Sequence, residues 1–258
     1  MSDASTVQKI GWTDLEKEKQ IMKTKHFLIA LVLVTALLTG CGSKARVGAL
    51  QTESQTVELG DARSVRIEID LGAGDLDVTG GAEKLLEADF IYNVAELKPE
   101  VEYTDGTLVV RQPESRGLPV LRDITDFRNE WGMRLNDAVP MDLRVDVGAG
   151  AGNLRLSGLS LTGLDITLGA GKSMIDLSGD WMRDLNVTMN AGAGDITVRL
   201  PRDVGARVKV NAGLGTIETR GLEQNENIYI NSAYGESEIT LQVDIDAGVG
   251  QINLEVED

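Results

Sequence analysis

A short segment built around a pair of glycines recurs along this chain in seven copies, one of which keeps only the second glycine. From the second copy onward the segments follow one another at intervals of roughly 20 residues, the spacing typical of solenoid coils. The segments are IDLGAGDLDV from Ile69, VGAGAGNLRL from Val147, TLGAGKSMID from Thr167, MNAGAGDITV from Met189, VNAGLGTIET from Val210, INSAYGESEI from Ile230 and IDAGVGQINL from Ile245. Their second glycines are Gly74, Gly152, Gly171, Gly194, Gly215, Gly235 and Gly250.

Apolar residues alternate with polar ones on both sides of each glycine pair. Val145 and Val147 precede one pair, and Ile175 and Leu177 follow another. Period-two patterns rich in β-branched residues predict strands with one buried face, and glycine suits a sharp corner between them. The sequence therefore predicts an all-β protein. Residues 141–258 are predicted to form a stacked β-solenoid or β-helix-like domain with Gly-x-Gly corners, and a smaller β module is predicted over residues 57–115 before it.

One segment contains GAGKS, which resembles the phosphate-binding loop of nucleotide hydrolases. Such a loop needs a glycine five positions before its Gly-Lys-Ser and a helix after it. Here Ile166 occupies the first position, and residues 174–179 are too short and too β-branched for a helix. We therefore expect no nucleotide and no other cofactor at Lys172.

Two sets of polar residues accompany the corners. The first, predicted to form an asparagine ladder or alternatively to bind a cation, comprises Asp70, Gly148, Thr167, Asn190, Asn211, Asn231 and Asp246. The second follows the corners and is predicted to be a solvated face, with a glycan-binding face as the alternative: Asp77, Arg155, Asp176, Thr197, Glu218 and Asn253.

The repeat pattern breaks between the first and second segments. Residues 85–94 and 101–111 are typical of strands, whereas residues 116–140 are predicted to be a helical or loop joint. There Asp126 would cap a short helix over residues 129–135, and Trp131 would cover the open end of the stack. At the carboxyl end, Glu255, Glu257 and Asp258 would put negative charge on the terminal coil and discourage another chain from adding to it.

The first 56 residues predict export and lipidation. Lys23 and Lys25 precede an apolar run over residues 27–38 that is too short to span a bilayer, as in secretory signals. The run ends in Leu38-Thr39-Gly40-Cys41, which resembles a bacterial lipobox. We interpret residues 1–21 as an untranslated upstream extension, 22–40 as a lipoprotein signal peptide and 41–56 as the lipidated amino terminus and tether. Cys41 is the predicted lipidation site, and an ordinary signal with an incidental cysteine is the alternative.

Composition restricts the chemistry of the mature chain. Removal of residues 1–40 leaves 37 acidic and 20 basic residues, a net charge of −17, which disfavours nucleic acids and anionic surfaces as partners. The one histidine, His26, is removed with the signal. Histidine-dependent catalytic triads and the usual zinc sites are therefore excluded. We predict a protein that is not an enzyme, with no catalytic and no metal-binding residues.

The lipobox, the variable amino-terminal part and the Gly-Ala-Gly corners and Leu-Ser-Gly turns of residues 142–181 together resemble the bacterial toast-rack lipoproteins. The resemblance covers the chain from about Val47 onward. Proteins of that family resemble surface adhesins and the carboxyl-terminal domains of cell-envelope antibiotic-stress proteins. The resemblance implies a stacked β architecture of unknown function and no catalytic residues.

These observations favour a non-enzymatic, extracytoplasmic lipoprotein that is anchored in the cell membrane or outer membrane. Its rigid β stack would serve envelope interaction, adhesion or stress sensing, with an unidentified envelope protein or glycan as partner. The alternative is a β-helix protein that binds or degrades surface polysaccharide. In that case Asp75 and Asp77, or Asp146 and Asp165, would supply paired carboxylates. A calcium-stabilised adhesin is a third hypothesis.

Overall fold

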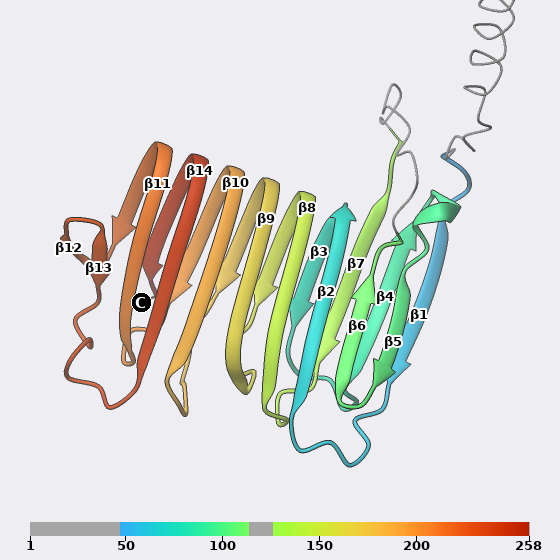
Figure 1. Ribbon diagram of the computed structural model, residues 1–258, viewed down its shortest axis with the longest axis horizontal. Coiled ribbons are helices and arrows are strands. Elements are labelled where there is room, and N and C mark those ends of the chain that lie inside the picture. The colour runs from blue at the N-terminus through green and yellow to red at the C-terminus, as the bar shows by residue number, and fades with distance from the viewer. Residues whose placement is uncertain (1–46, 114–125, 258) are drawn as a thin grey trace, which may run out of the picture. The chain divides into compact units, whose positions relative to one another are not determined.

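The fold is seen in a computed structural model that describes residues 47–113 and 126–257. The predictions for residues 1–40, and the lipidation of Cys41, concern residues outside these ranges. The described residues form one sheet of 14 strands (Figure 1). The strands are β1 Gln51–Val57, β2 Val65–Ala73, β3 Asp75–Thr79, β4 Leu86–Tyr92, β5 Glu100–Thr104, β6 Thr107–Arg111, β7 Asn129–Leu135, β8 Met141–Arg155, β9 Leu161–Asp176, β10 Leu185–Leu200, β11 Gly205–Arg220, β12 Glu223–Asn225, β13 Ile228–Ile230 and β14 Thr240–Val256. A single 3-10 turn among them, η1, spans Ala95–Leu97.

Five of the strands, β8, β9, β10, β14 and β11, run through a glycine corner and bend there. They pair in parallel along their whole length and arch over at one edge, so that the halves before and after the bend form two layers (Figure 1). Val145 before the bend and Leu154 after it are both buried between the layers. The alternation of apolar residues thus fills one core from both sides. The predicted all-β stacked fold with Gly-x-Gly corners is confirmed.

The amino-terminal strands extend both layers of the same sheet. β2 pairs with β8 before the bend and β3 pairs with β8 after it, and Gly74 between them is the first corner. β6 and β5 continue the first layer beyond β2, while β7, β4 and β1 continue the second layer beyond β3. The segments 57–115 and 141–258 therefore contribute strands to one continuous sheet.

The predicted helix over residues 129–135 is wrong. This segment is strand β7, in which Asn129, Trp131, Met133 and Leu135 alternate as buried residues. Trp131 does not cover an end of the stack, because β7 lies between β3 and β4. Its ring packs edge-on against Phe90 in the core, with 5.4 Å between ring centroids. The alternation of buried and exposed residues along this segment predicts a strand, and it is the stronger signal than the possible helix cap at Asp126.

Two further predictions about the amino-terminal part need correction. The tether predicted to extend to residue 56 ends earlier, because Gln51–Val57 forms edge strand β1, antiparallel to β4. Residues 101–111 contain not one strand but most of the hairpin β5–β6. Its two-residue turn, Asp105-Gly106, has positive φ at both positions, as the right-handed twist of a tight hairpin requires.

The coils do not stack in chain order. The segment at Ile230 is not a corner, since β13 ends at Ile230 and the chain then crosses over, so that β14 lies between β10 and β11. Glu255 therefore lies inside the sheet rather than on a terminal coil. In register it stands between Arg199 and Arg220, and the Arg220–Glu255 pair is 3.3 Å apart. Chain-order stacking would instead place the two arginines side by side, which cross-strand repulsion disfavours.

A buried asparagine holds the segment that makes this crossing. The Asn231 side chain is 3 % exposed and accepts a bond from the Ala206 amide at 2.9 Å. Its amide nitrogen donates to the carbonyl oxygens of Pro201 and Val204 at 2.9 and 2.8 Å. Asn231 thus ties the crossing segment to the turn before β11.

We expect Asn231→Ala to destabilise the protein by about 2 kcal/mol, because it leaves buried backbone groups without partners. Chemical denaturation followed by circular dichroism measures the change. Asn227→Ala is the matched control: Asn227 is only half-buried, and its side chain donates to the exposed Asn211 rather than to buried backbone groups. If both variants lost the same free energy of unfolding, the buried hydrogen bonds of Asn231 would not be what holds the crossing segment in place.

Candidate binding surface

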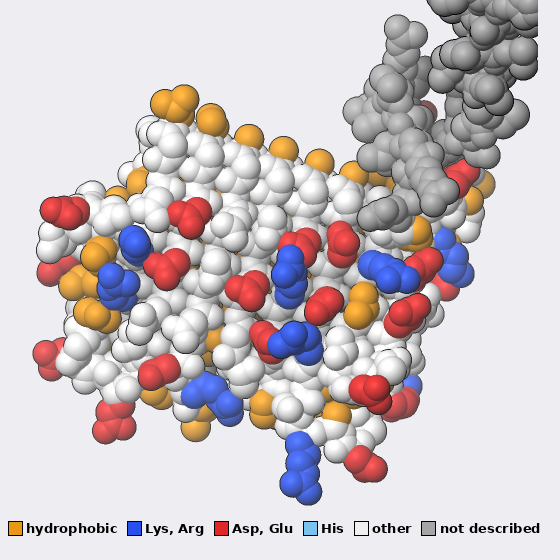
Figure 2. Space-filling model, in the orientation of Figure 1, with side chains coloured by type: hydrophobic (Ala, Val, Ile, Leu, Met, Phe, Trp, Pro, Cys, Tyr) orange, Lys and Arg blue, Asp and Glu red, His pale blue; other side chains and the backbone are white. Residues whose placement is uncertain are grey.

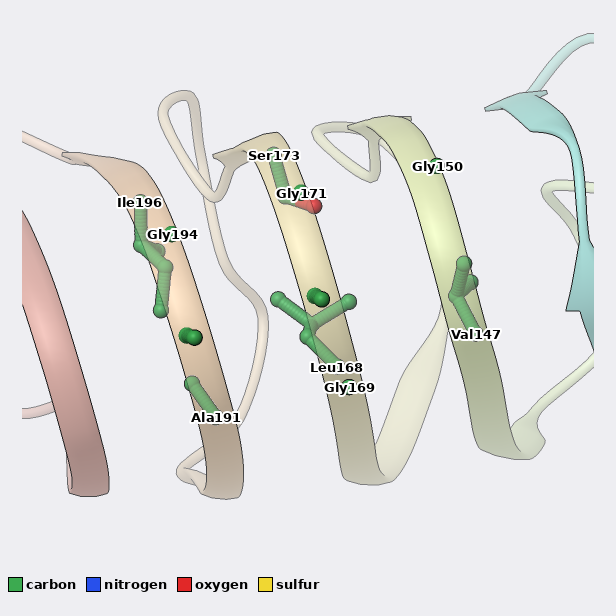
Figure 3. A pocket seen from close by; sticks show the side chains of 11 residues that line it. Val147, Gly150, Leu168, Gly169, Gly171, Ser173, Ala191, Gly194 and Ile196 are labelled. Atoms are coloured by element: carbon green, nitrogen blue, oxygen red, sulfur yellow. The ribbon is translucent and has the colours of Figure 1, made fainter.

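Two columns of glycine run along the corner edge, and neighbouring strands approach each other there more closely than any other residue permits. A Cβ atom added at Gly171 would lie 1.8 Å from the Gly150 carbonyl oxygen, and one added at Gly169 would lie 2.0 Å from that of Gly148. Figure 3 shows these corners on successive strands. The columns are Gly72, Gly148, Gly169, Gly192, Gly248 and Gly213, followed by Gly74, Gly150, Gly171, Gly194, Gly250 and Gly215.

The GAGKS segment is one of these corners. The neighbouring backbone fills the space beside Gly169 and Gly171, and the chain continues as strand β9 to Asp176 rather than as a helix. Lys172 is exposed and stands in register between Ala151 and Asp195. Close strand packing therefore accounts for these glycines without a phosphate ligand.

The second repeat pairs two residues earlier than predicted. Gly150, not Gly152, stands beside Gly171, while Gly152 pairs with Leu76 and Ser173. The polar column consequently contains Asp146 in place of Gly148, and Asn231 lies outside it. Two residues also leave the row that follows the corners, Arg155 because of the same offset and Asp176 because it stands five residues after Gly171 rather than three. Arg155 and Asp176 pair with each other one row further on, and Asn153 and Met174 take their places.

The polar column forms a ladder at its carboxyl-terminal end. The Asn211 side chain donates to the Asp246 carboxylate at 2.8 Å and accepts from Asn227 at 3.0 Å. At the other end Asp146 is paired with Arg144 at 2.8 Å. Within residues 47–113 and 126–257 no three His, Cys, Asp or Glu side chains cluster closely enough to hold a metal ion.

A hollowed surface lies on the outer face of the second layer, over Gly132. Gly132 has no side chain, and an added Cβ would meet only the Asp89 carbonyl oxygen, at 3.8 Å. Two adjoining hollows of about 440 and 430 Å³ meet there, and we call them together the Gly132 groove. Its charged lining residues are Asp75, Asp77, Glu87, Asp89, Glu130, Arg134 and Arg155.

The charges of the Gly132 groove are held by neighbouring strands. Asp77 accepts from Arg155 at 2.8 Å and from Asn153 at 2.7 Å, while Arg134 pairs with Glu87. Asp75 accepts a bond from the Ala151 amide at 3.2 Å. The structure thus places the candidate carboxylates Asp75 and Asp77 in one groove, where each bonds to β8. The other candidate pair, Asp146 and Asp165, lies on the outer face of the first layer, on β8 and β9.

Strand β1 at the border of the groove is secured by one ion pair. Lys98, just after η1, contacts the Glu53 carboxylate at 2.9 Å, and the Tyr92 hydroxyl donates to it at 3.3 Å. The hydrogen bond from Lys98 lowers the pKa of Glu53, although burial acts in the opposite direction. Burial raises the pKa of Tyr92.

A model of a known protein family matches more than half of the chain. Residues 46–199 match the model of the N-terminal domain of toast_rack, DUF2154. The chain belongs to the toast-rack family. The carboxyl-terminal coils beyond the match continue the same toast-rack sheet through β14 and β11. In the described residues no helix is long and apolar enough to cross a bilayer.

Two solved structures are similar to this chain to different degrees. The putative cell adhesion protein from Clostridium sporogenes is 34 % identical, with a TM-score of 0.78, and the alignment covers 81 % of this chain and 100 % of that one. The putative adhesin from Bacteroides fragilis is 13 % identical, with a TM-score of 0.32 over 80 % of this chain and 97 % of that one. The likeness to the latter is too low to carry an argument. No curated protein matches the chain.

Proposed function

We propose that this toast-rack protein is a lipid-anchored, extracytoplasmic protein of the bacterial envelope that presents its β stack as a binding surface. The observation that carries the proposal is the distance from Cys41 to the sheet. Only nine residues lie between Cys41 and Gln51, where β1 begins, and every residue of β1 pairs with β4. An acyl group on Cys41 would therefore hold the whole sheet close to its membrane. The toast-rack family and the Clostridium sporogenes protein fit this role.

The Gly132 groove is the surface proposed for the partner. It combines a hollow with carboxylates and guanidinium groups that neighbouring strands already orient, which reduces the entropy lost on binding. Trp131 lies beneath it but is 1 % exposed, so it offers no ring on which a sugar could stack. The groove thus favours a polar segment of an envelope protein over a glycan. The contacts that hold Asp75 and Asp77 favour binding over hydrolysis.

The anchor is tested by changing Cys41 in cells that export the protein. We expect Cys41→Ala to move the protein from the membrane fraction to the soluble extracytoplasmic fraction, because the acyl chains would no longer be attached. Mass spectrometry of the wild-type amino-terminal peptide should show the acyl mass. A Cys41→Ala protein that stays in the membrane fraction, with an unacylated wild type, would refute the anchor.

The groove is tested by cross-linking in intact cells. A photoreactive residue replacing Ser54, at the rim of the groove, should give an adduct with one envelope protein, and Gly132→Trp should abolish it by filling the hollow. Thr188→Trp is the matched control, since Thr188 is exposed on the other layer. An adduct that survives Gly132→Trp, or that Thr188→Trp removes equally, would reject the groove as the binding surface.

A further inference from the structure

The bent edge of the sheet carries a continuous row of apolar side chains, which are exposed except at Ala73, where the side chain is half-buried. These residues stand between the two glycines of each corner and pair with one another from strand to strand. We call them the corner ridge: Ala73, Ala149, Ala170, Ala193, Val249 and Leu214. Figure 2 shows them as a line of apolar side chains along the upper edge. The largest lie at the β11 end, where Leu214 is 73 % and Val249 is 54 % exposed.

The geometry of the corner makes the ridge protrude. A glycine column lies on each side of it, so no neighbouring side chain covers the apolar groups. With strands about 4.8 Å apart, six ridge positions extend over roughly 24 Å. Close strand packing explains the glycines but not the apolar residues between them, because polar side chains would be equally free to point into solvent.

The amino-terminal end of the described chain reaches the same edge. Asn129 lies against Gly74, and Tyr92 pairs with both Asn129 and Gln51, so the corner row continues across β7 and β4 to the start of β1. In Figure 1, β1 begins at the edge where the long strands bend. Four of the six large exposed apolar residues in the described ranges lie along this edge: Val47, Leu50, Val249 and Leu214.

The chain from the predicted anchor to this edge is short. Val47 is six positions after Cys41, and the chain between them spans at most about 20 Å when fully extended. An acyl group on Cys41 would thus keep the corner edge near the bilayer at its β1 end. Leu214 and Val249 lie at the opposite end of the ridge, where they would provide a second point of contact.

We propose that the corner ridge rests on the lipid surface that holds Cys41, with Leu214 and Val249 inserted at the end far from the anchor. This inference rests on the proposed lipid anchor. The contact is weak by itself, because four of the six ridge residues are alanines, and it becomes stable when the anchor raises the local concentration of ridge at the surface.

The charged residues beside the corner ridge determine which lipid headgroups the ridge can contact. Asp70, Asp146 and Asp246 stand two residues before the first glycine column, and Asp75 and Asp195 stand one residue after the second. Lys172, beside Asp195, is the one basic residue in these two rows, so five carboxylates stand against one ammonium group. These carboxylates repel anionic headgroups, so the ridge favours zwitterionic lipid. They also argue against a second copy of the chain as the occupant, since a ridge-to-ridge dimer would bring the acidic rows of both copies together.

The test uses the acylated protein in phosphatidylcholine vesicles that contain brominated lipid, which quenches tryptophan at membrane depth. Leu214→Trp should lose fluorescence beyond that of the unsubstituted protein, because Trp131 and Trp181 are buried. Met182→Trp is the matched control, since Met182 is apolar, 89 % exposed and located between β9 and β10 at the edge away from the corners. It should show no added quenching, and anionic phosphatidylglycerol should reduce the quenching of Leu214→Trp.

The outcomes separate the ridge from the anchor. Mass spectrometry first reports whether Cys41 is acylated. If it is acylated and the two tryptophans are quenched equally or not at all, the ridge proposal fails and the anchor stands. If it is not acylated, the anchor fails, and coupling the Cys41 thiol to a maleimide lipid lets the same comparison decide the ridge. Vesicle-free cross-linking of two copies through Leu214 would also overturn it.

Discussion

Replacing Gly171 by alanine is expected to destabilise the protein by at least about 4 kcal/mol, enough to unfold many domains. Gly171 has a φ of +145°, which residues with a Cβ rarely adopt. The added Cβ would also lie 1.8 Å from the Gly150 carbonyl oxygen, and Gly194 approaches Gly171 from the other side in the same way. Strands β8, β9 and β10 would all have to move, because backbone rather than a flexible side chain occupies the space.

A glycine that has a positive φ but no close neighbours shows how much stability is lost through backbone strain alone, without steric crowding. Gly158 has a φ of +86° and no atom within 4 Å of an added Cβ. Gly158→Ala should therefore cost only about 1 to 2 kcal/mol, the cost of a left-handed conformation. Guanidinium denaturation followed by circular dichroism gives both values. If the two variants lose the same stability, close approach of the strands is not the reason for the corner glycines.

Local patterns were sufficient to predict most of the long strands and five of the seven corners. Alternating apolar residues such as Ile175 and Leu177 lie on one face of a strand, and this alternation can be recognised within a few neighbouring residues of the sequence. β7 carried the same signal in Trp131, Met133 and Leu135, but Asp126 was interpreted as the cap of a short helix over these residues. Asp105-Gly106 is likewise a typical hairpin turn, which the interpretation of residues 101–111 as a single strand did not take into account.

Register and strand order could not be predicted from local patterns. A shift of two residues in GAGAG keeps every side chain on its own face, so hydrophobic alternation does not distinguish Gly150 from Gly152 as the corner. The position of β14 depends on partners far away in sequence, such as Glu255 between Arg199 and Arg220. The Gly132 groove was missed for the same reason, because it forms only where β1, β4, β7, β3 and β8 meet. Lipidation of Cys41 stays a prediction.

Removing residues 239–258, and with them β14, is expected to prevent the carboxyl-terminal half of the sheet from folding. β14 pairs with β10 on one side and β11 on the other. Its buried side chains, each about 1.5 to 3 kcal/mol, together amount to roughly 10 kcal/mol, comparable with the stability of a whole domain. They are Leu241, Val243, Ile245, Ile252 and Leu254. In a solenoid stacked in chain order, loss of the last coil would instead leave the preceding coils paired.

Limited proteolysis with mass spectrometry distinguishes these two architectures. Without β14, we expect rapid cleavage throughout β11, since direct pairing of β11 with β10 would bring Arg220 against Arg199. Removing residues 257 and 258 alone is the control and should cost only about 1 kcal/mol, because it removes the solvent-exposed Arg199–Glu257 pair, at 3.4 Å, and two hydrogen bonds of the Glu257 backbone at the end of the chain, and leaves the core side chains of β14 in place. If the variant without β14 melts in one transition at the wild-type temperature with β11 still protected, the interior position of β14 does not stabilise the sheet.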